Sequence, residues 1–170
     1  QPGSRHPQVV FGTDISADLS RRDLSLNAMA MDRTGVIVDP FDGHRAIEER
    51  MLEVPGGGYE NTLSILRDDP LRLLRIARFA ARFGFPPTDD TTRAAAESAP
   101  DLRHISHERW RVEMEKTLLS PRLDVGFVWL VEVGGLEQFL PVAAGLSTER
   151  ARLICRRLDA TERDTTSRWA

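Results

Sequence analysis

The residues most capable of chemistry lie in an arginine-rich stretch between positions 67 and 83. At 100° per residue, Leu73, Ala77 and the alanines that follow fall on one side of a helix, and the charged residues fall on the other. That charged side consists of Asp68, Arg72, Arg75, Arg78 and Arg82. An Asp three or four residues before an Arg is its neighbour on a helix surface and can fix the direction of its planar guanidinium. A guanidinium held in this way can recognise a planar group or an anion.

Two other groups of polar residues could support such a surface. Asp23 and Asn27 are four positions apart and would share one face of a helix. Arg109, Glu113 and Lys116 would form the charged side of a helix over residues 106–119. The spacing of these three residues favours a structural salt-bridge set that braces the arginine-rich helix over a catalytic role.

Glycine and histidine spacings elsewhere give no comparable signal. The three glycines at positions 56–58 resemble a phosphate-binding loop, but no Lys-Ser/Thr pair follows them, so they indicate a surface connection. His104 and His107 are three positions apart without a third ligand nearby, which argues against a metal site.

The elements that must position these residues differ before and after the three glycines. The first part is expected to contain strands at 9–11 and 36–38, a turn at 14–20, and helices over about 20–32 and 43–51. The second part is expected to contain only helices, at about 62–83, 89–98, 106–119, 122–139 and from 148 onward. This pattern predicts an α+β fold that is mainly α. The few strands cannot bury both faces of a sheet, so the first part reads as the tail end of a domain.

Composition restricts the class of protein. With 41% hydrophobic and 29% charged residues, the chain can form a core. It contains no run of about 20 apolar residues, and a single cysteine, Cys155, cannot form an internal disulfide, so we expect a cytoplasmic protein without membrane contact. A net charge of −3 argues against coating of nucleic acid by bulk charge, and any RNA binding must use a local basic face.

Three blocks of sequence carry a family resemblance. The first contains Arg5, His6 and Pro7, followed by residues 18–30 (DLSRRDLSLNAMA) and 39–43 (DPFDG). The second covers residues 67–79 (RDDPLRLLRIARF), and the third covers residues 105–116 (ISHERWRVEMEK). In this order, the blocks resemble the class II tRNA nucleotidyltransferases and the bacterial poly(A) polymerases. The family patterns are R-R-D-F-T-I-N-A-M-A, E-D-P-L-R-x-L-R-x-x-R-F and I-S-x-E-R-x-x-x-E-x-x-K.

The resemblance implies an activity and a site. Members typically add C, C and A to a tRNA 3′ end from CTP and ATP, without a nucleic-acid template. The resemblance implies that Asp69 and Arg72 form a protein template for the base. It further implies a nucleotide-binding set of Arg22, Asp23, Asn27, Asp69, Arg72, Arg75 and Arg78, in which Asp23 meets the ribose hydroxyl. Two departures from the family are Asp68 in place of Glu and Leu24-Ser25 in place of Phe-Thr.

The resemblance also predicts a domain division. Residues 1–58 would be the C-terminal part of a nucleotidyltransferase head, residues 59–147 a helical neck and body that bind nucleotide and RNA, and residues 148–170 the start of a further helical region. The family's Asp-x-Asp pair, which holds two Mg²⁺ ions for phosphoryl transfer, lies upstream of the Arg5 block. No Asp-x-Asp occurs in this chain, so we expect a fragment without catalytic or metal-binding residues of its own.

Several alternatives remain at this stage. Poly(A) polymerase activity, or addition of only CC or only A, would use the same three blocks. A non-catalytic RNA-binding module derived from a relative is a hypothesis of another class, and a purely structural helical protein is a third. The expected partners are nucleoside triphosphates and the 3′ end of tRNA or another RNA.

Overall fold

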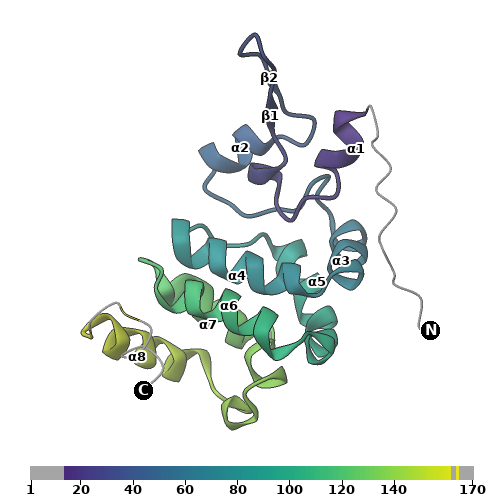
Figure 1. Cartoon of the computed structure of the whole chain (residues 1–170). Helices are drawn as coiled ribbons and strands as arrows, with labels where there is room; N and C mark the ends of the chain where they lie inside the picture. The colour runs from purple at the N-terminus through teal and green to yellow at the C-terminus, as the bar shows by residue number, and fades with distance from the viewer. Residues whose placement is uncertain (1–13, 162–163, 165–170) are drawn as a thin grey trace, which may run out of the picture.

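The computed structural model describes residues 14–161 and residue 164, and its fold is α+β and mainly α, as predicted (Figure 1). An upper part consists of short elements: α1 (Ile15–Leu19), the 3₁₀ helix η1 (Ser25–Asn27), β1 (Ala30–Met31), β2 (Ile37–Val38) and α2 (Gly43–Glu48). The two strands pair antiparallel, with Ala30 opposite Val38. The strand expected at 9–11 lies outside the described residues.

The rest of the described chain is helical and lies below this upper part in Figure 1. Its α-helices are α3 (Tyr59–Asp68), α4 (Leu71–Phe83), α5 (Asp89–Ser98), α6 (His107–Leu118), α7 (Leu123–Glu132) and α8 (Thr148–Asp159). Three 3₁₀ helices connect them: η2 (Ala99–His104), η3 (Leu136–Gln138) and η4 (Pro141–Ala143). Helix α4 packs on both α6 and α7, α3 packs on α5, and α8 packs on the far side of α7. No helix in the described part of the chain is long and apolar enough to span a membrane.

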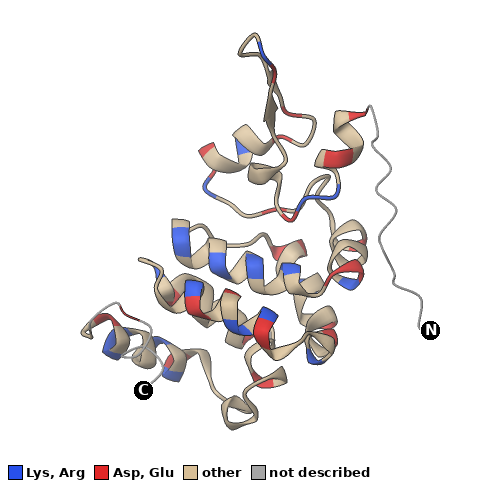
Figure 2. Cartoon of the chain, viewed as in Figure 1, with Lys and Arg blue, Asp and Glu red and all other residues tan. Residues whose placement is uncertain are grey.

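Helix α4 is the centre of the helical part because its apolar face is fully buried. Leu73, Leu74, Ile76 and Ala77 are each no more than 1% exposed. A Cβ added to Gly126 of α7 would lie 2.0 Å from the carbonyl oxygen of Ala77, so the two helix backbones are in direct contact. The arginines recur along the opposite side of α4 (Figure 2), and two of them, Arg72 and Arg75, contact the upper part of the molecule.

The prediction of a single helix over residues 62–83 is wrong, because the structure contains two helices joined at Asp69 and Pro70. Proline has no N–H to donate within a helix, and it disfavours helical backbone angles in the residue before it. Asp69 accordingly adopts an extended conformation (φ −144°, ψ 94°), while Pro70 precedes the first turn of α4, a position that proline tolerates. The apolar period continues through the break, which is why the pattern suggested one helix.

Two expectations for the upper part are also wrong. The turn expected at 14–20 is instead helix α1, whose first turn is capped by the Asp14 carboxylate accepting from the Ser16 N–H. The helix expected at about 20–32 is a turn, η1 and β1. Its residues bond to a distant segment: the Ser25 N–H donates to the Glu53 carbonyl (2.8 Å), and the Ser25 hydroxyl donates to the Val54 carbonyl (3.0 Å).

Most of the helical boundaries follow the sequence signals. Helix α5 occupies the predicted residues, and α6 begins directly after Ser106. Helix α4 ends before Gly84, whose backbone is left-handed (φ +72°) and whose N–H donates to the Ala80 carbonyl. The helix expected over 122–139 ends earlier, at Glu132, because the chain turns through Gly134 (φ +68°).

Candidate functional site

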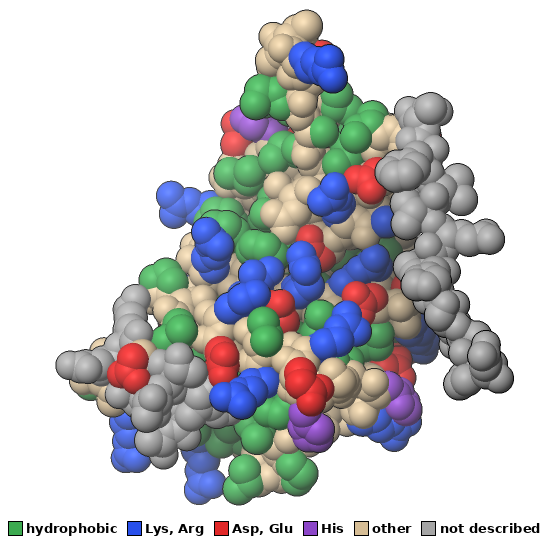
Figure 3. Space-filling model, viewed as in Figure 1, with side chains coloured by type: hydrophobic (Ala, Val, Ile, Leu, Met, Phe, Trp, Pro, Cys, Tyr) green, Lys and Arg blue, Asp and Glu red, His purple; other side chains and the backbone are tan. Residues whose placement is uncertain are grey.

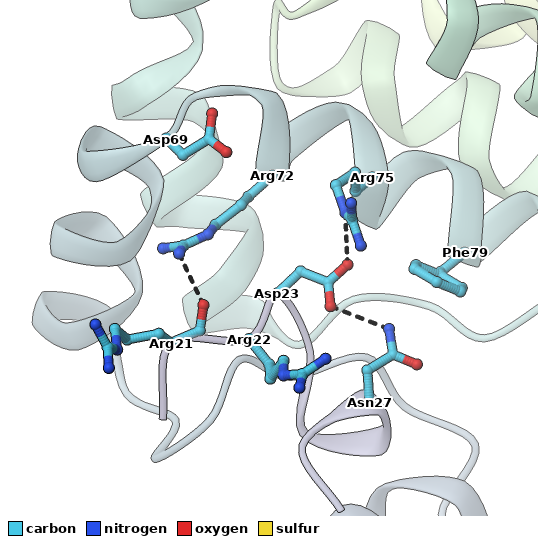
Figure 4. A pocket seen from close by; sticks show the side chains of 8 residues that line it. All are labelled: Arg21, Arg22, Asp23, Asn27, Asp69, Arg72, Arg75 and Phe79. Carbon is cyan, nitrogen blue, oxygen red and sulfur yellow. Dashed lines mark hydrogen bonds and ion pairs between the residues drawn. The ribbon is translucent and has the colours of Figure 1, made fainter. Parts of the chain in front are cut away.

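A pocket of about 480 Å³ lies where the upper part of the molecule meets α4 (Figure 4). Its lining residues come from two distant segments. One is η1 with the turn that precedes it, and the other is the α3–α4 junction with α4 itself. They are Arg21, Arg22, Asp23, Asn27, Asp69, Arg72, Arg75 and Phe79. The structure therefore brings together six of the seven residues that the sequence nominated for nucleotide binding, all except Arg78.

Asp23 is the buried centre of this pocket, with its side chain 5% exposed. One carboxylate oxygen accepts from the Leu24 N–H (3.1 Å) and from the Asn27 amide (3.0 Å). The other oxygen accepts from Nε of Arg75 at 2.7 Å, which joins the upper part to α4. A carboxylate this deeply buried requires such partners, and an ionised pair held by hydrogen bonds is a firm link between the two segments.

Arg72 is held by two backbone carbonyls. Its Nη1 donates to the Ile65 carbonyl in the last turn of α3 (2.9 Å), and its Nη2 donates to the Arg21 carbonyl (2.8 Å; Figure 4). The last carbonyls of a helix lack partners from a following turn and carry the negative end of its dipole, so they favour a cation. The guanidinium plane of Arg72 is thereby fixed from two sides.

Asp69 lies beside Arg72 but pairs elsewhere. Its Oδ1 accepts from the Leu71 N–H (3.3 Å) and lies 3.4 Å from Nη2 of Arg109. Asp69 and Arg72 do not share one helix face, because Asp69 belongs to the link between α3 and α4. Asp68, at the end of α3, is exposed and is not among the residues that line the pocket.

Arg78 points toward α6 and is not among the lining residues. Its Nε lies 2.8 Å from Oε2 of Glu113, and the two atoms form an ion pair and not a hydrogen bond. The two side chains are 15% and 8% exposed, and Nζ of Lys116 lies 3.8 Å from the other Glu113 oxygen. The Arg78 guanidinium also covers the ring of Phe79 at 4.3 Å. Charged residues of α6 thus contact α4 or its N-terminal link.

The pocket is basic overall. It is lined by four arginines and two aspartates, and Figure 3 shows basic side chains gathered where the upper part meets α4. Arg22 is about half exposed and pairs at 2.8 Å with Asp18, four residues earlier in the chain. Among the described residues, no group of three His, Cys, Asp or Glu side chains could hold a metal ion. The arrangement suits an anionic ligand that also carries a polar planar group.

Two lining residues were not nominated from the sequence. Arg21 contributes its carbonyl oxygen to Arg72, and main-chain contacts of this range leave no sequence signal. Phe79 lies seven residues after Arg72, two helical turns along the same face, so helical periodicity could have indicated it.

Comparison with protein families gives two matches. Residues 1–53 match the model described as "Poly A polymerase head domain". Residues 84–146 match the model described as "Probable RNA and SrmB- binding site of polymerase A".

Individual relatives are similar over most of the chain. The chain is 38% identical to a protein named CCA-adding enzyme from Geobacillus kaustophilus (strain HTA426), over 93% of this chain and 42% of the relative. A crystal structure of the Bacillus stearothermophilus CCA-adding enzyme in complex with CTP superposes with a TM-score of 0.70 at 32% identity. It covers 95% of this chain and 44% of that one.

A further structure, of a CCA-adding enzyme with ATP, has a TM-score of 0.65 at 31% identity, over 75% of this chain and 31% of that chain. The chain therefore spans about two fifths of the length of the first two proteins.

Proposed function

Because the chain belongs to the class II CCA-adding enzyme family, we propose that it is part of an enzyme that adds C, C and A to tRNA 3′ ends. The observation that carries this proposal is the pocket, in which the turn before η1 faces the N-terminal half of α4. Both walls come from sequence blocks that resemble the family. We further propose that residues 1–58 belong to the head and that residues 59–147 form the nucleotide- and RNA-binding helices.

Asp69 and Arg72 select the base in this proposal. Cytosine and adenine both present an amino donor next to a ring nitrogen acceptor. A carboxylate can accept from the amino group, while a guanidinium donates to the ring nitrogen. Uracil and guanine present a carbonyl oxygen and a ring N–H at the corresponding positions, so the same two side chains would be left mispaired.

The other lining residues hold the rest of the nucleotide. An ionised carboxylate has about four acceptor sites, and three donors contact Asp23, so one site remains for a ribose hydroxyl. Asn27 orients that carboxylate, and Arg22 and Arg75 supply positive charge for the triphosphate. Arg78 acts indirectly, because it does not line the pocket and its guanidinium is directed to Glu113 of α6.

The proposal assigns no step to a metal held by the described residues, which contain no suitable ligand group. The Mg²⁺ ions that the family uses for in-line phosphoryl transfer would be held by carboxylates outside them. The substrates are CTP, ATP and the 3′ end of a tRNA, which imply a cytoplasmic location.

Nucleotide incorporation by the intact protein tests the proposal. A tRNA that ends before CCA should gain C, C and A from a mixture of CTP and ATP. Asp69→Ala and Arg72→Ala should each weaken use of the correct nucleotide by about 1–3 kcal/mol, the effect of losing a charged hydrogen-bonding partner. Arg33→Ala, which removes an exposed arginine of the β1–β2 turn, is the matched control and should have no effect.

Two outcomes would contradict the proposal in different ways. Homopolymeric A tails would assign the protein to the poly(A) polymerases, the class named by both matching family models. Binding of RNA without any incorporation, by the intact protein with Mg²⁺ present, would instead indicate a non-catalytic binding module.

A further inference from the structure

The break between α3 and α4 changes what surrounds the proposed base-reading pair. In an unbroken helix, Asp69 and Arg72 would be neighbours at the i, i+3 spacing and would pair with each other. In the structure they form no ion pair: Asp69 contacts Leu71 and Arg109, and Arg72 reaches toward Arg21 (Figure 4).

Pro70 causes this break. It cannot donate to the carbonyl four residues earlier, and it excludes helical geometry at Asp69, whose ψ of 94° turns the chain out of α3. The break also leaves Ile65 in a terminal turn, where its carbonyl oxygen accepts from Nη1 of Arg72.

We infer that Pro70 is a positioning residue for base selection, because it keeps Asp69 and Arg72 from neutralising each other. This inference rests on the proposed function. A carboxylate and a guanidinium that pair with each other have fewer free lone pairs and N–H groups for a base. Neutral carbonyls can fix the guanidinium without cancelling its charge, and three of its five N–H groups remain available.

The acceptor is positioned separately from the donor. Arg109 of α6 lies against Asp69, but its side chain is 54% exposed and that of Asp69 is 40% exposed, so the pair is solvated and weak. An incoming base can therefore compete for the Asp69 carboxylate. The donor of the proposed pair, Arg72, is thus held by carbonyls of α3 and of the turn before η1. The acceptor, Asp69, is held by Arg109 of α6.

Replacement of Pro70 tests this role through nucleotide selectivity. Alanine is a better helix former than glycine and a far better one than proline, so Pro70→Ala favours continuation of α3 into α4 and Pro70→Gly favours it less. The intact protein is assayed with CTP and with UTP on a tRNA that ends before CCA. The preference for CTP, as a ratio of kcat/KM values, should fall about tenfold in Pro70→Ala, and by less in Pro70→Gly.

Pro100→Ala is the matched control, because Pro100 is exposed and lies in the first turn of the 3₁₀ helix η2, outside the pocket lining. It should leave the CTP preference unchanged. Thermal unfolding of each variant shows whether it is folded, and Pro70→Gly carries the test if Pro70→Ala does not fold.

The possible results separate the two proposals. A folded Pro70→Ala protein with its full CTP preference would overturn the positioning role, while loss of preference in Asp69→Ala and Arg72→Ala would leave the proposed function intact. If those two variants also kept the full preference, the proposed base-reading pair itself would be refuted, and the role of Pro70 with it.

Discussion

The buried ion pair between Arg78 and Glu113 gives a prediction with a large expected magnitude. The pair joins α4 to α6 behind the pocket, with Nε and Oε2 2.8 Å apart. Arg78→Met keeps a long apolar side chain but removes the charge, which leaves Glu113 buried with only Lys116 at 3.8 Å.

Loss of one member of a buried pair costs about 3–5 kcal/mol, because the remaining charge is uncompensated. Lys116 stays close enough to offset part of this cost, so we expect the free energy of unfolding to fall by about 3 kcal/mol, at the lower end of that range. For a chain of this size, this corresponds to a fall in melting temperature of about 6–12 °C. The double variant Arg78→Met/Glu113→Leu should regain stability to within about 1 kcal/mol of the parent.

Urea unfolding followed by circular dichroism measures both free energies. Lys116→Met in the parent is the control and should change stability by less than about 1 kcal/mol, since its side chain is half exposed. The reasoning would be refuted if Arg78→Met lost less than about 1 kcal/mol, or if the double variant were no more stable than the single one.

Three further predictions concern the packing and ionisation of other residues. Gly126→Ala should lower the free energy of unfolding by about 3 kcal/mol, because the added Cβ would lie 2.0 Å from the Ala77 carbonyl oxygen. An unchanged melting temperature would contradict the close packing of α7 on α4. Gly84→Ala should cost about 1 kcal/mol in the same assay, since φ is +72°, and a stabilised variant would argue against the left-handed helix end. The pKa of Tyr59 is raised above 10.0, mainly by the hydrogen bond that its hydroxyl donates to Glu97. This hydrogen bond therefore stabilises the fold below pH 10.0, and the stabilisation is lost as pH rises through the higher pKa of the folded state. Tyr59 is the chain's one tyrosine, so ultraviolet titration should show this pKa falling toward 10.0 in Glu97→Gln; no change would exclude the hydrogen bond as the cause.

Helices that pack by a regular apolar face could be predicted from the sequence. The bounds of α5 follow from Thr88 as its N-cap and from the alanines on its buried face. The buried face of α4 was also predictable, because each arginine is separated from the next by apolar residues at helical spacing. These signals are local, so no knowledge of the partner helices was needed.

Contacts between distant residues decided the parts that the sequence did not reveal. The turn before η1 is not a helix because Ser25 bonds to carbonyls 28 and 29 positions away. Arg72 finds its partner at Arg21, 51 positions away, and no periodicity encodes that pairing. The break at Pro70 did have a local signal, but the continuous apolar period masked it.

The origin of the pocket in two distant segments also links ligand binding to the stability of the fold. A ligand that contacts both walls binds the folded chain and not the unfolded one. At a concentration of 100 times Kd, such a ligand raises the free energy of unfolding by about 2.7 kcal/mol. For a chain of this size, the melting temperature would rise by about 5–11 °C. Heat unfolding with and without CTP, the proposed substrate, therefore tests occupancy of the pocket without any turnover, even in a protein that cannot transfer a nucleotide.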